Sequence, residues 1–216
     1  MTIIEYTIVD AFTSVPFQGN PAAVVIVPSD QTFSDLLLQN IAAEFNLSET
    51  AFITTSNAGQ ISSADEPCVH FGLRWFSPKT EIRLCGHATL ASAQVLFADT
   101  KLVASGVDLI KFATLSGELV ARRVAGGKVE LEFPAGLAKK ADDELSGSVI
   151  ALVHQALGSS PLVKEVHVGV GATYGAFALV NLEESFDLEA AQVEASLFVR
   201  TLTIMTSNKI LTKYRV

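Results

Sequence analysis

The stretch Cys85-Gly86-His87-Ala88-Thr89 stands at the head of an apolar segment and decides how the chain folds. The next eight residues, Leu-Ala-Ser-Ala-Gln-Val-Leu-Phe at 90–97, have the composition of a buried helix. The start of a helix exposes backbone N–H groups that lack intrahelical partners, and such groups attract anions. An imidazole beside them can take up or release a proton. The stretch therefore predicts a site that binds a small carboxylate and moves a proton.

Strands dominate the sequence on both sides of this stretch. Residues 74–84, just before it, are typical of a strand, a turn and a second short strand. Apolar residues at helical spacing predict a further helix over 33–45, with Ser29, Asp30 or Thr32 available as its N-cap. Many strands with few helices indicate an α+β fold. The other expected strands are 3–10, 22–27, 51–55, 69–76, 109–115, 118–124 and 128–133.

The chain is expected to form two domains that repeat one pattern. A polar segment over 136–147 predicts a linker between a first domain, 1–135, and a second, 148–216. Residues 22–46 align with 175–199, and 50–57 align with 201–208 with five identities in eight. Two amphipathic strand–helix–strand units could also look alike by chance, but a duplication is the favoured interpretation. The offset of 151 places the counterpart of Cys85 near position 236, so the second domain is expected to be incomplete in this chain of 216 residues.

Composition excludes several classes of function. The net charge of −8 argues against nucleic-acid binding, because no basic cluster could neutralise phosphates. No apolar run reaches the roughly 18 residues that span a bilayer, so no membrane association is expected. Glu5 and Asp10 interrupt any secretory signal, and two cysteines make no disulfide framework. The expected setting is the cytoplasm.

Glu49 is the candidate acid–base residue. It lies where a helix has ended and an apolar strand begins, and apolar neighbours raise the proton affinity of a carboxylate. An exposed loop glutamate or a capping residue would look the same from the local sequence. A base opposite the helix start at His87 would form a geometry for moving a proton beside a bound carboxylate. That combination favours the catalytic interpretation of Glu49.

The other candidates also have structural alternatives. His87 could simply donate to the backbone near a helix cap. Cys85 could be a thiol acid–base whose pKa falls at a helix N-terminus, although a small apolar filler is the commoner role. Gly19 and Asn20 can offer backbone and amide donors to a ligand, and turn chemistry would explain them equally well.

A metal centre is a weaker alternative. The pairs Cys68-x-His70 and Cys85-x-His87 could together supply four zinc ligands. The spacing is unusual for zinc, and His87 already has a role in the predicted anion site. We therefore expect no metal.

Five motifs together resemble one enzyme family. They are Val9-Asp10-Ala11-Phe12-Thr13, Gly19-Asn20-Pro21-Ala22, Asn46-Leu47-Ser48-Glu49-Thr50-Ala51-Phe52, Arg74-Trp75-Phe76-Ser77-Pro78 and Cys85-Gly86-His87-Ala88-Thr89-Leu90. On these motifs the chain resembles the PhzF family of phenazine-biosynthesis-like isomerases, which are related in fold to diaminopimelate epimerase. The resemblance is close over about the first 135 residues and looser to about residue 205.

The resemblance implies two similar domains, each a curled mixed sheet around a central helix, with the active site between them. It implies that Glu49 shuttles a proton on a small carboxylate-bearing substrate without metal or organic cofactor, and that the protein is a homodimer. The family's second domain normally adds an Asp-Pro-small-Thr-Gly-Ser-Ala segment, which this sequence lacks. Impaired activity is therefore expected, and a catalytically silent small-molecule-binding or oligomerising protein on the same scaffold is the alternative. The residues expected to bind substrate are Gly19, Asn20, Cys85, Gly86, His87, Ala88 and Thr89.

Overall fold

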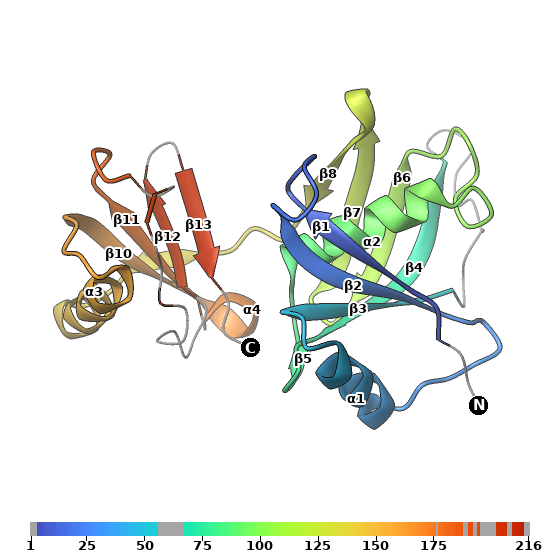
Figure 1. Ribbon diagram of the computed structural model, residues 1–216, viewed down its shortest axis with the longest axis horizontal. Coiled ribbons are helices and arrows are strands. Elements are labelled where there is room, and N and C mark those ends of the chain that lie inside the picture. Colours follow the sequence, from blue (N-terminus) through green and yellow to red (C-terminus); the bar gives the residue numbers. More distant parts are fainter. Residues whose placement is uncertain are drawn as a thin grey trace. The chain divides into compact units, whose positions relative to one another are not determined.

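The protein is described from a computed structural model, in which the chain forms two compact units (Figure 1). The boundary between the units falls between Pro134 and Ala135. The structure describes residues 4–55, 67–175, 177–187, 190, 191, 194, 202–206 and 209–213. Each unit has its own sheet and its own core of buried side chains.

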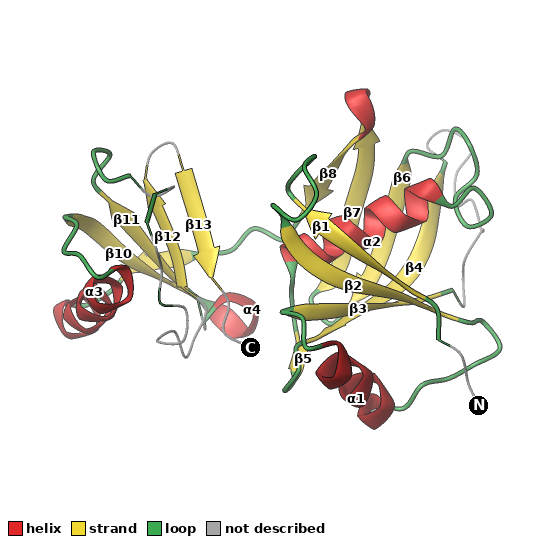
Figure 2. Cartoon of the chain, in the orientation of Figure 1, coloured by secondary structure: helices red, strands yellow, loops and turns green. Residues whose placement is uncertain are grey.

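The first unit is a mixed sheet of eight strands that curls around one helix, α2 (Gly86–Ala98), as Figure 2 shows. The strand order is β1-β2-β3-β4-β6-β7-β8, and β5 pairs with β4. The pairs β2–β3 and β4–β6 are parallel and the others are antiparallel. The strands are β1 (Tyr6–Ala11), β2 (Asn20–Val27), β3 (Glu49–Thr54), β4 (Cys68–Phe76), β5 (Glu81–Ile82), β6 (Leu109–Thr114), β7 (Gly117–Val124) and β8 (Lys128–Glu132).

Helix α2 is buried because small and apolar side chains occur on all its sides. Ala88, Ala91 and Leu96 have no solvent exposure, so the sheet approaches the helix closely. The surrounding strands contribute large fully buried side chains, including Trp75 and Phe112. The sequence prediction of a buried helix after Thr89 is confirmed.

A second helix, α1 (Asp35–Phe45), packs on the outer face of the sheet. Its apolar side, with Leu38 and Ala42 buried, meets Phe52 and Phe76. The expected N-caps at 29, 30 and 32 were wrong: the hydroxyl of Ser34 accepts the N–H of Leu37, so the helix begins later. The helix ends at Asn46, which adopts a left-handed conformation and places the chain for β3.

The second unit is a five-stranded sheet with the order β13-β12-β11-β10-β9. Helix α3 packs against it and contributes Val153, Ala156 and Leu157 to a core shared with Val166 and Val180. The elements are β9 (Ala138–Lys140), α3 (Asp143–Leu157), β10 (Val163–Gly169), α4 (Gly171–Tyr174), β11 (Ala178–Leu182), β12 (Leu202–Thr206) and β13 (Lys209–Lys213).

The segment 136–147 differs from the expected linker. It contains β9, which pairs with β10, and the first turns of α3, where the side chain of Asp142 accepts the N–H of Leu145. Its polar residues are exposed because they lie on an edge strand and at a helix start, not because the segment lacks structure. Polar composition alone does not distinguish these cases.

Strand pairing in the second unit follows the pattern of the first. The pairs β1–β2, β2–β3 and β3–β4 are antiparallel, parallel and antiparallel, and so are β10–β11, β11–β12 and β12–β13. This agreement supports the predicted duplication. Most of 186–198, the aligned counterpart of the residues around α1, lies outside the described residues, as do residues 201, 207 and 208 of the second aligned segment.

Mixed sheets with separately placed helices confirm the predicted α+β class. In the part of the chain that the structure describes, no helix is both long and apolar enough to cross a membrane.

Candidate active site

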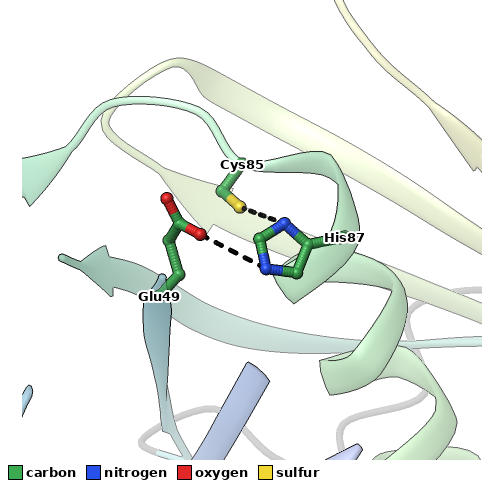
Figure 3. Close-up of side chains that lie close together, drawn as sticks. All are labelled: Glu49, Cys85 and His87. Carbon is green, nitrogen blue, oxygen red and sulfur yellow. Dashed lines mark hydrogen bonds and ion pairs between the residues drawn. The ribbon is translucent and has the colours of Figure 1, made fainter. Parts of the chain in front are cut away.

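The parallel pairing of β2 with β3 positions the site. Glu49, the first residue of β3, is in register with Ala22, so the chain before Ala22 lies at the same edge of the sheet. Helix α2 begins at this edge, and its residue His87 points toward Glu49 (Figure 3). The distance from Glu49 Oε2 to His87 Nε2 is 3.2 Å. The fold therefore brings together two residues that are 38 positions apart.

The imidazole of His87 lies between two further groups. Its Nδ1 is 3.3 Å from the sulfur of Cys85, and its Nε2 is 3.3 Å from Ser48 Oγ (Figure 3 shows the first contact). A carboxyl group, an imidazole and a thiol thus form a continuous cluster that starts on β3 and ends at the start of α2. Such a chain of polar groups can hold a proton at several positions.

Burial shifts the pKa values of Glu49 and His87 in opposite directions. The side chains are only 3% and 2% exposed. Desolvation raises the pKa of Glu49 to about 7, while a hydrogen bond from Ser48 acts to lower it. Desolvation lowers the pKa of His87 to about 4, against the effect of a hydrogen bond to the Pro21 backbone. The predicted rise in the proton affinity of Glu49 is present.

Because the pKa of His87 is lowered, Glu49 is in contact with a neutral imidazole. Near neutral pH the ring of His87 is uncharged, so the 3.2 Å contact is not a salt bridge. Within the described residues, Glu49 Oε2 has no well-aligned hydrogen-bond donor. A carboxyl group in this state can both give and accept a proton near neutral pH.

Cys85 differs from the expectation that its pKa falls. Burial raises the pKa of the thiol well above its usual value, and the nearby charge of Glu49 adds to the increase. Backbone hydrogen bonds from Ala88 and His87 act in the opposite direction but do not outweigh burial. The thiol is therefore neutral at the pH where a helix-start thiolate was expected.

The start of α2 has both reachable and buried parts. Gly86 is half-buried, whereas Ala88 and Thr89 are fully buried. The hydroxyl of Thr89 donates to the carbonyl of Cys85, which occupies its donor within the helix. Gly86 is thus the part of this stretch best placed for a ligand, because the backbone of His87 and Ala88 hydrogen-bonds the Cys85 thiol. The binding roles of Ala88 and Thr89 stay predictions.

Gly19 and Asn20 lie at the same edge of the sheet as Glu49, because Asn20 begins β2 two residues before Ala22. A Cβ added at Gly19 would lie 2.5 Å from the carbonyl oxygen of Ala11, so only glycine fits there. This close approach is a structural reason for glycine at position 19. Contact of Gly19 with substrate remains a prediction.

The two Cys-x-His pairs do not assemble into the four-ligand zinc site weighed from the sequence. Cys68 begins β4, whereas Phe76 at the other end of that strand pairs with Thr50, next to Glu49. Eight residue steps of strand correspond to about 26 Å. Cys68 has its own contact, 3.6 Å from Nε2 of His70.

A cavity of about 680 Å³ opens between β1, α2 and β8. Its lining includes Ala11 and Thr13, which also surround Gly19, but it does not include Glu49. The cavity therefore lies beside the loop that ends at Gly19 and not at the cluster of Glu49, His87 and Cys85.

Sequence reasoning missed Ser48 and Pro21. Ser48 contacts His87 and hydrogen-bonds Glu49, and the backbone of Pro21 interacts with His87. Both lie directly beside predicted site residues, and this adjacency is the signal that could have identified them.

The model of the PhzC-PhzF family, described as phenazine biosynthesis-like protein, matches residues 9–213. The chain belongs to this family. A human phenazine biosynthesis-like domain-containing protein is 41% identical over 185 residues, which cover 82% of this chain and 60% of that protein. A Halalkalibacterium halodurans protein named as an uncharacterized isomerase is 44% identical over 128 residues, 59% of this chain and 42% of that protein.

Solved structures show the same fold. A PhzF-family protein from Enterococcus faecalis aligns with a TM-score of 0.66 and 28% identity, over 97% of this chain and 72% of that chain. This likeness confirms the predicted PhzF-like fold. The chain spans about three fifths of the length of the first curated PhzF relatives that it matches.

Proposed function

We propose that this PhzF-family protein is an isomerase that moves a proton on a small carboxylate-bearing substrate. The observation that carries the proposal is the buried pairing of Glu49 with His87 at the start of α2. Relatives of the chain include bacterial proteins named as uncharacterized isomerases, which supports the general class of reaction.

Glu49 acts as the general acid and base in this proposal. Its carboxylate removes a proton from a carbon near the substrate carboxylate, and the resulting carboxylic acid returns a proton at a second position. A pKa of about 7 fits both steps near neutral pH. His87, as a neutral ring, positions the Glu49 carboxylate and the substrate.

The start of α2 holds the substrate carboxylate. The backbone N–H of Gly86 attracts an anion because the first turn of a helix leaves it without an intrahelical acceptor. Gly19 and Asn20 contribute donors from the neighbouring loop. No step of this scheme requires a metal or an organic cofactor.

Solvent deuterium exchange tests the proposal without knowledge of the natural substrate. The chain is incubated in D₂O with a panel of small carboxylates, and mass spectrometry measures deuterium incorporation. We expect incorporation by the wild type and a reduction of about 10²–10⁴-fold for Glu49→Gln, the range for loss of a general acid–base group. Glu44→Gln, which alters an exposed carboxylate on α1, is the matched control and should exchange as the wild type does.

Equal incorporation by wild type and Glu49→Gln would contradict the catalytic role. Binding of carboxylates with no exchange by the wild type would favour the alternative, a silent binding protein on the same scaffold.

We also propose that the protein is a cytoplasmic homodimer, as its family resemblance implies. Both cysteines are free thiols, which suits a reducing compartment. Size-exclusion chromatography with light scattering should give about twice the chain mass of 23.0 kDa. A mass equal to one chain would contradict the dimer.

A further inference from the structure

Three unlike metal-ligating side chains converge at the edge of the first unit's sheet. One ligand atom from each of Glu49, Cys85 and His87 lies within 4.8 Å of the others. Among the described residues, this is the only group of three or more His, Cys, Asp or Glu side chains with that property. We propose that the group binds one zinc ion, which inhibits proton transfer and is not a cofactor of it.

The donor atoms lie close enough together for side-chain rotations to arrange them around one tetrahedral ion. Zinc bonds of about 2.3 Å to sulfur and about 2.0 Å to nitrogen and oxygen place neighbouring ligand atoms about 3.3–3.6 Å apart. In the structure, His87 contacts the two other residues through different ring nitrogens: Nε2 is 3.2 Å from Glu49 Oε2, and Nδ1 is 3.3 Å from Cys85 Sγ. One ion bonds a single ring nitrogen, so side-chain rotations of Glu49 and Cys85 must complete the site.

Burial of the three residues favours a ligand set whose charge cancels that of the ion. All three side chains are almost fully buried. A thiolate, a carboxylate and a neutral imidazole carry two negative charges, which one divalent cation neutralises. An uncompensated charge in such a place is costly, whereas a neutral complex is not.

The chemistry of the donors selects the ion. Thiolate and imidazole ligands suit zinc, whereas magnesium and calcium prefer oxygen ligands. Three protein ligands leave a fourth position for a water molecule or for Ser48 Oγ, which lies 3.3 Å from His87 Nε2. The ion bonds the carboxylate of Glu49, which accepts the substrate proton in the proposed reaction. Bound zinc and proton transfer by Glu49 therefore exclude each other.

The chain contains a matched control for this site. Cys68 is also buried, and it also lies two residues before a histidine that it contacts. It belongs to no three-residue donor group among the described residues. Cys85→Ser and Cys68→Ser therefore remove the same atom from two Cys-x-His pairs, of which only the first belongs to a three-residue donor group in the described part of the chain.

Isothermal titration of the chelator-treated chain with zinc chloride tests the inference. We expect one zinc per chain for the wild type and for Cys68→Ser, and affinity at least about tenfold weaker for Cys85→Ser. Cobalt titration adds a structural readout, because a thiolate-to-cobalt charge-transfer band should appear in the wild type and Cys68→Ser only. No zinc uptake by the wild type, or equal loss in both cysteine variants, would overturn the proposal.

Glu49→Gln keeps the inference testable if Cys85→Ser fails to fold. This variant removes one charged ligand with little change of shape, and we expect the same loss of affinity; unchanged zinc affinity would count against the site. Inhibition by zinc rests on the proposed isomerase function, whereas zinc binding does not. Zinc uptake without deuterium exchange would remove the proposed isomerase only, and exchange without zinc uptake would remove the zinc site only.

Discussion

Helices α2 and α3 begin in opposite ways, although each packs against the sheet of its own unit. At the start of α3, Asp142 caps the N–H of Leu145, and two acidic residues in the first turn complement the helix dipole. At the start of α2, the N-cap residue Cys85 offers only its thiol to the backbone of His87 and Ala88, and the first turn has no acidic residue. The start of α3 is thus capped and charge-complemented, whereas the start of α2 has neither a carboxylate cap nor an acidic first turn.

The cores of the two units also differ in their content of buried polar side chains. Among the residues whose burial is described, all buried polar or charged side chains belong to the first unit. They are Glu49, Thr50, Ser77, His87, Thr89 and Ser92. Buried polar groups cost stability unless they are satisfied, so their concentration in one unit indicates where function is placed.

Removing one large core side chain from each unit is the strongest test of this comparison. Leu96 on α2 and Leu182 on β11 are both fully buried. Each substitution to alanine should lower the opening free energy of its own unit by about 2–5 kcal/mol, because it leaves a cavity. Hydrogen exchange measured by mass spectrometry reads the two units separately. Equal loss of protection in both units after either substitution would break the comparison.

The pH dependence of stability sharpens the contrast in buried polar groups. The carboxyl group of Glu49 keeps its proton up to a pKa of about 7, against an ordinary value of 4.5. The folded state is therefore favoured below pH 4.5, and it loses about 3 kcal/mol as pH rises through 7, at about 1.4 kcal/mol per pKa unit. His87, with its pKa lowered to about 4, acts in the opposite direction over an overlapping range: its contribution is present above 6.5 and is lost as pH falls through 4. Between about pH 4.5 and 6.5 the gain from His87 therefore offsets much of the loss from Glu49.

Urea unfolding of Glu49→Gln, from about pH 5 to about pH 8 with a chelator present, checks this expectation. In the wild type the effects of Glu49 and His87 largely cancel over this range, whereas the variant keeps only that of His87. The stability of Glu49→Gln should therefore increase relative to that of the wild type as pH rises. Glu144→Gln, an exposed change in the second unit, is the control and should follow the wild type. A parallel pH profile for wild type and Glu49→Gln would show that the carboxyl group does not carry this cost.

The smallest expected effect concerns the capped helix of the second unit. Asp142→Ala should destabilise α3 by about 1 kcal/mol, because the N–H of Leu145 loses its side-chain acceptor. Thermal unfolding monitored by hydrogen exchange in α3 measures the change. Asp143→Ala removes a neighbouring charge but no cap bond, so it should cost less. If both variants lost the same stability, the start of α3 would be stabilised by its negative charges and not by the capping hydrogen bond.

Local sequence patterns predicted most strands and both helices of the first unit. They failed where two structures share one composition. The polar residues of 136–147 form an edge strand and a helix start, and the same composition is typical of a linker. The N-cap of α1 was missed because Ser29, Asp30, Thr32 and Ser34 can all accept a backbone N–H through a side-chain oxygen. Which of them becomes the N-cap depends on where the helix starts in the folded structure.

The sequence by itself determined which groups are present at the site: a carboxylate before an apolar strand, and an imidazole with glycine at a helix start. Only the tertiary structure decided their state. The parallel register of β2 and β3 brings Glu49 to His87, and burial under the curled sheet raises one pKa and lowers the other. Cys85 shows the difference most clearly, because a helix start predicts a lowered thiol pKa and burial beside Glu49 raises it. Desolvation depends on every neighbour in space, so it cannot be read from residues that are adjacent only in sequence.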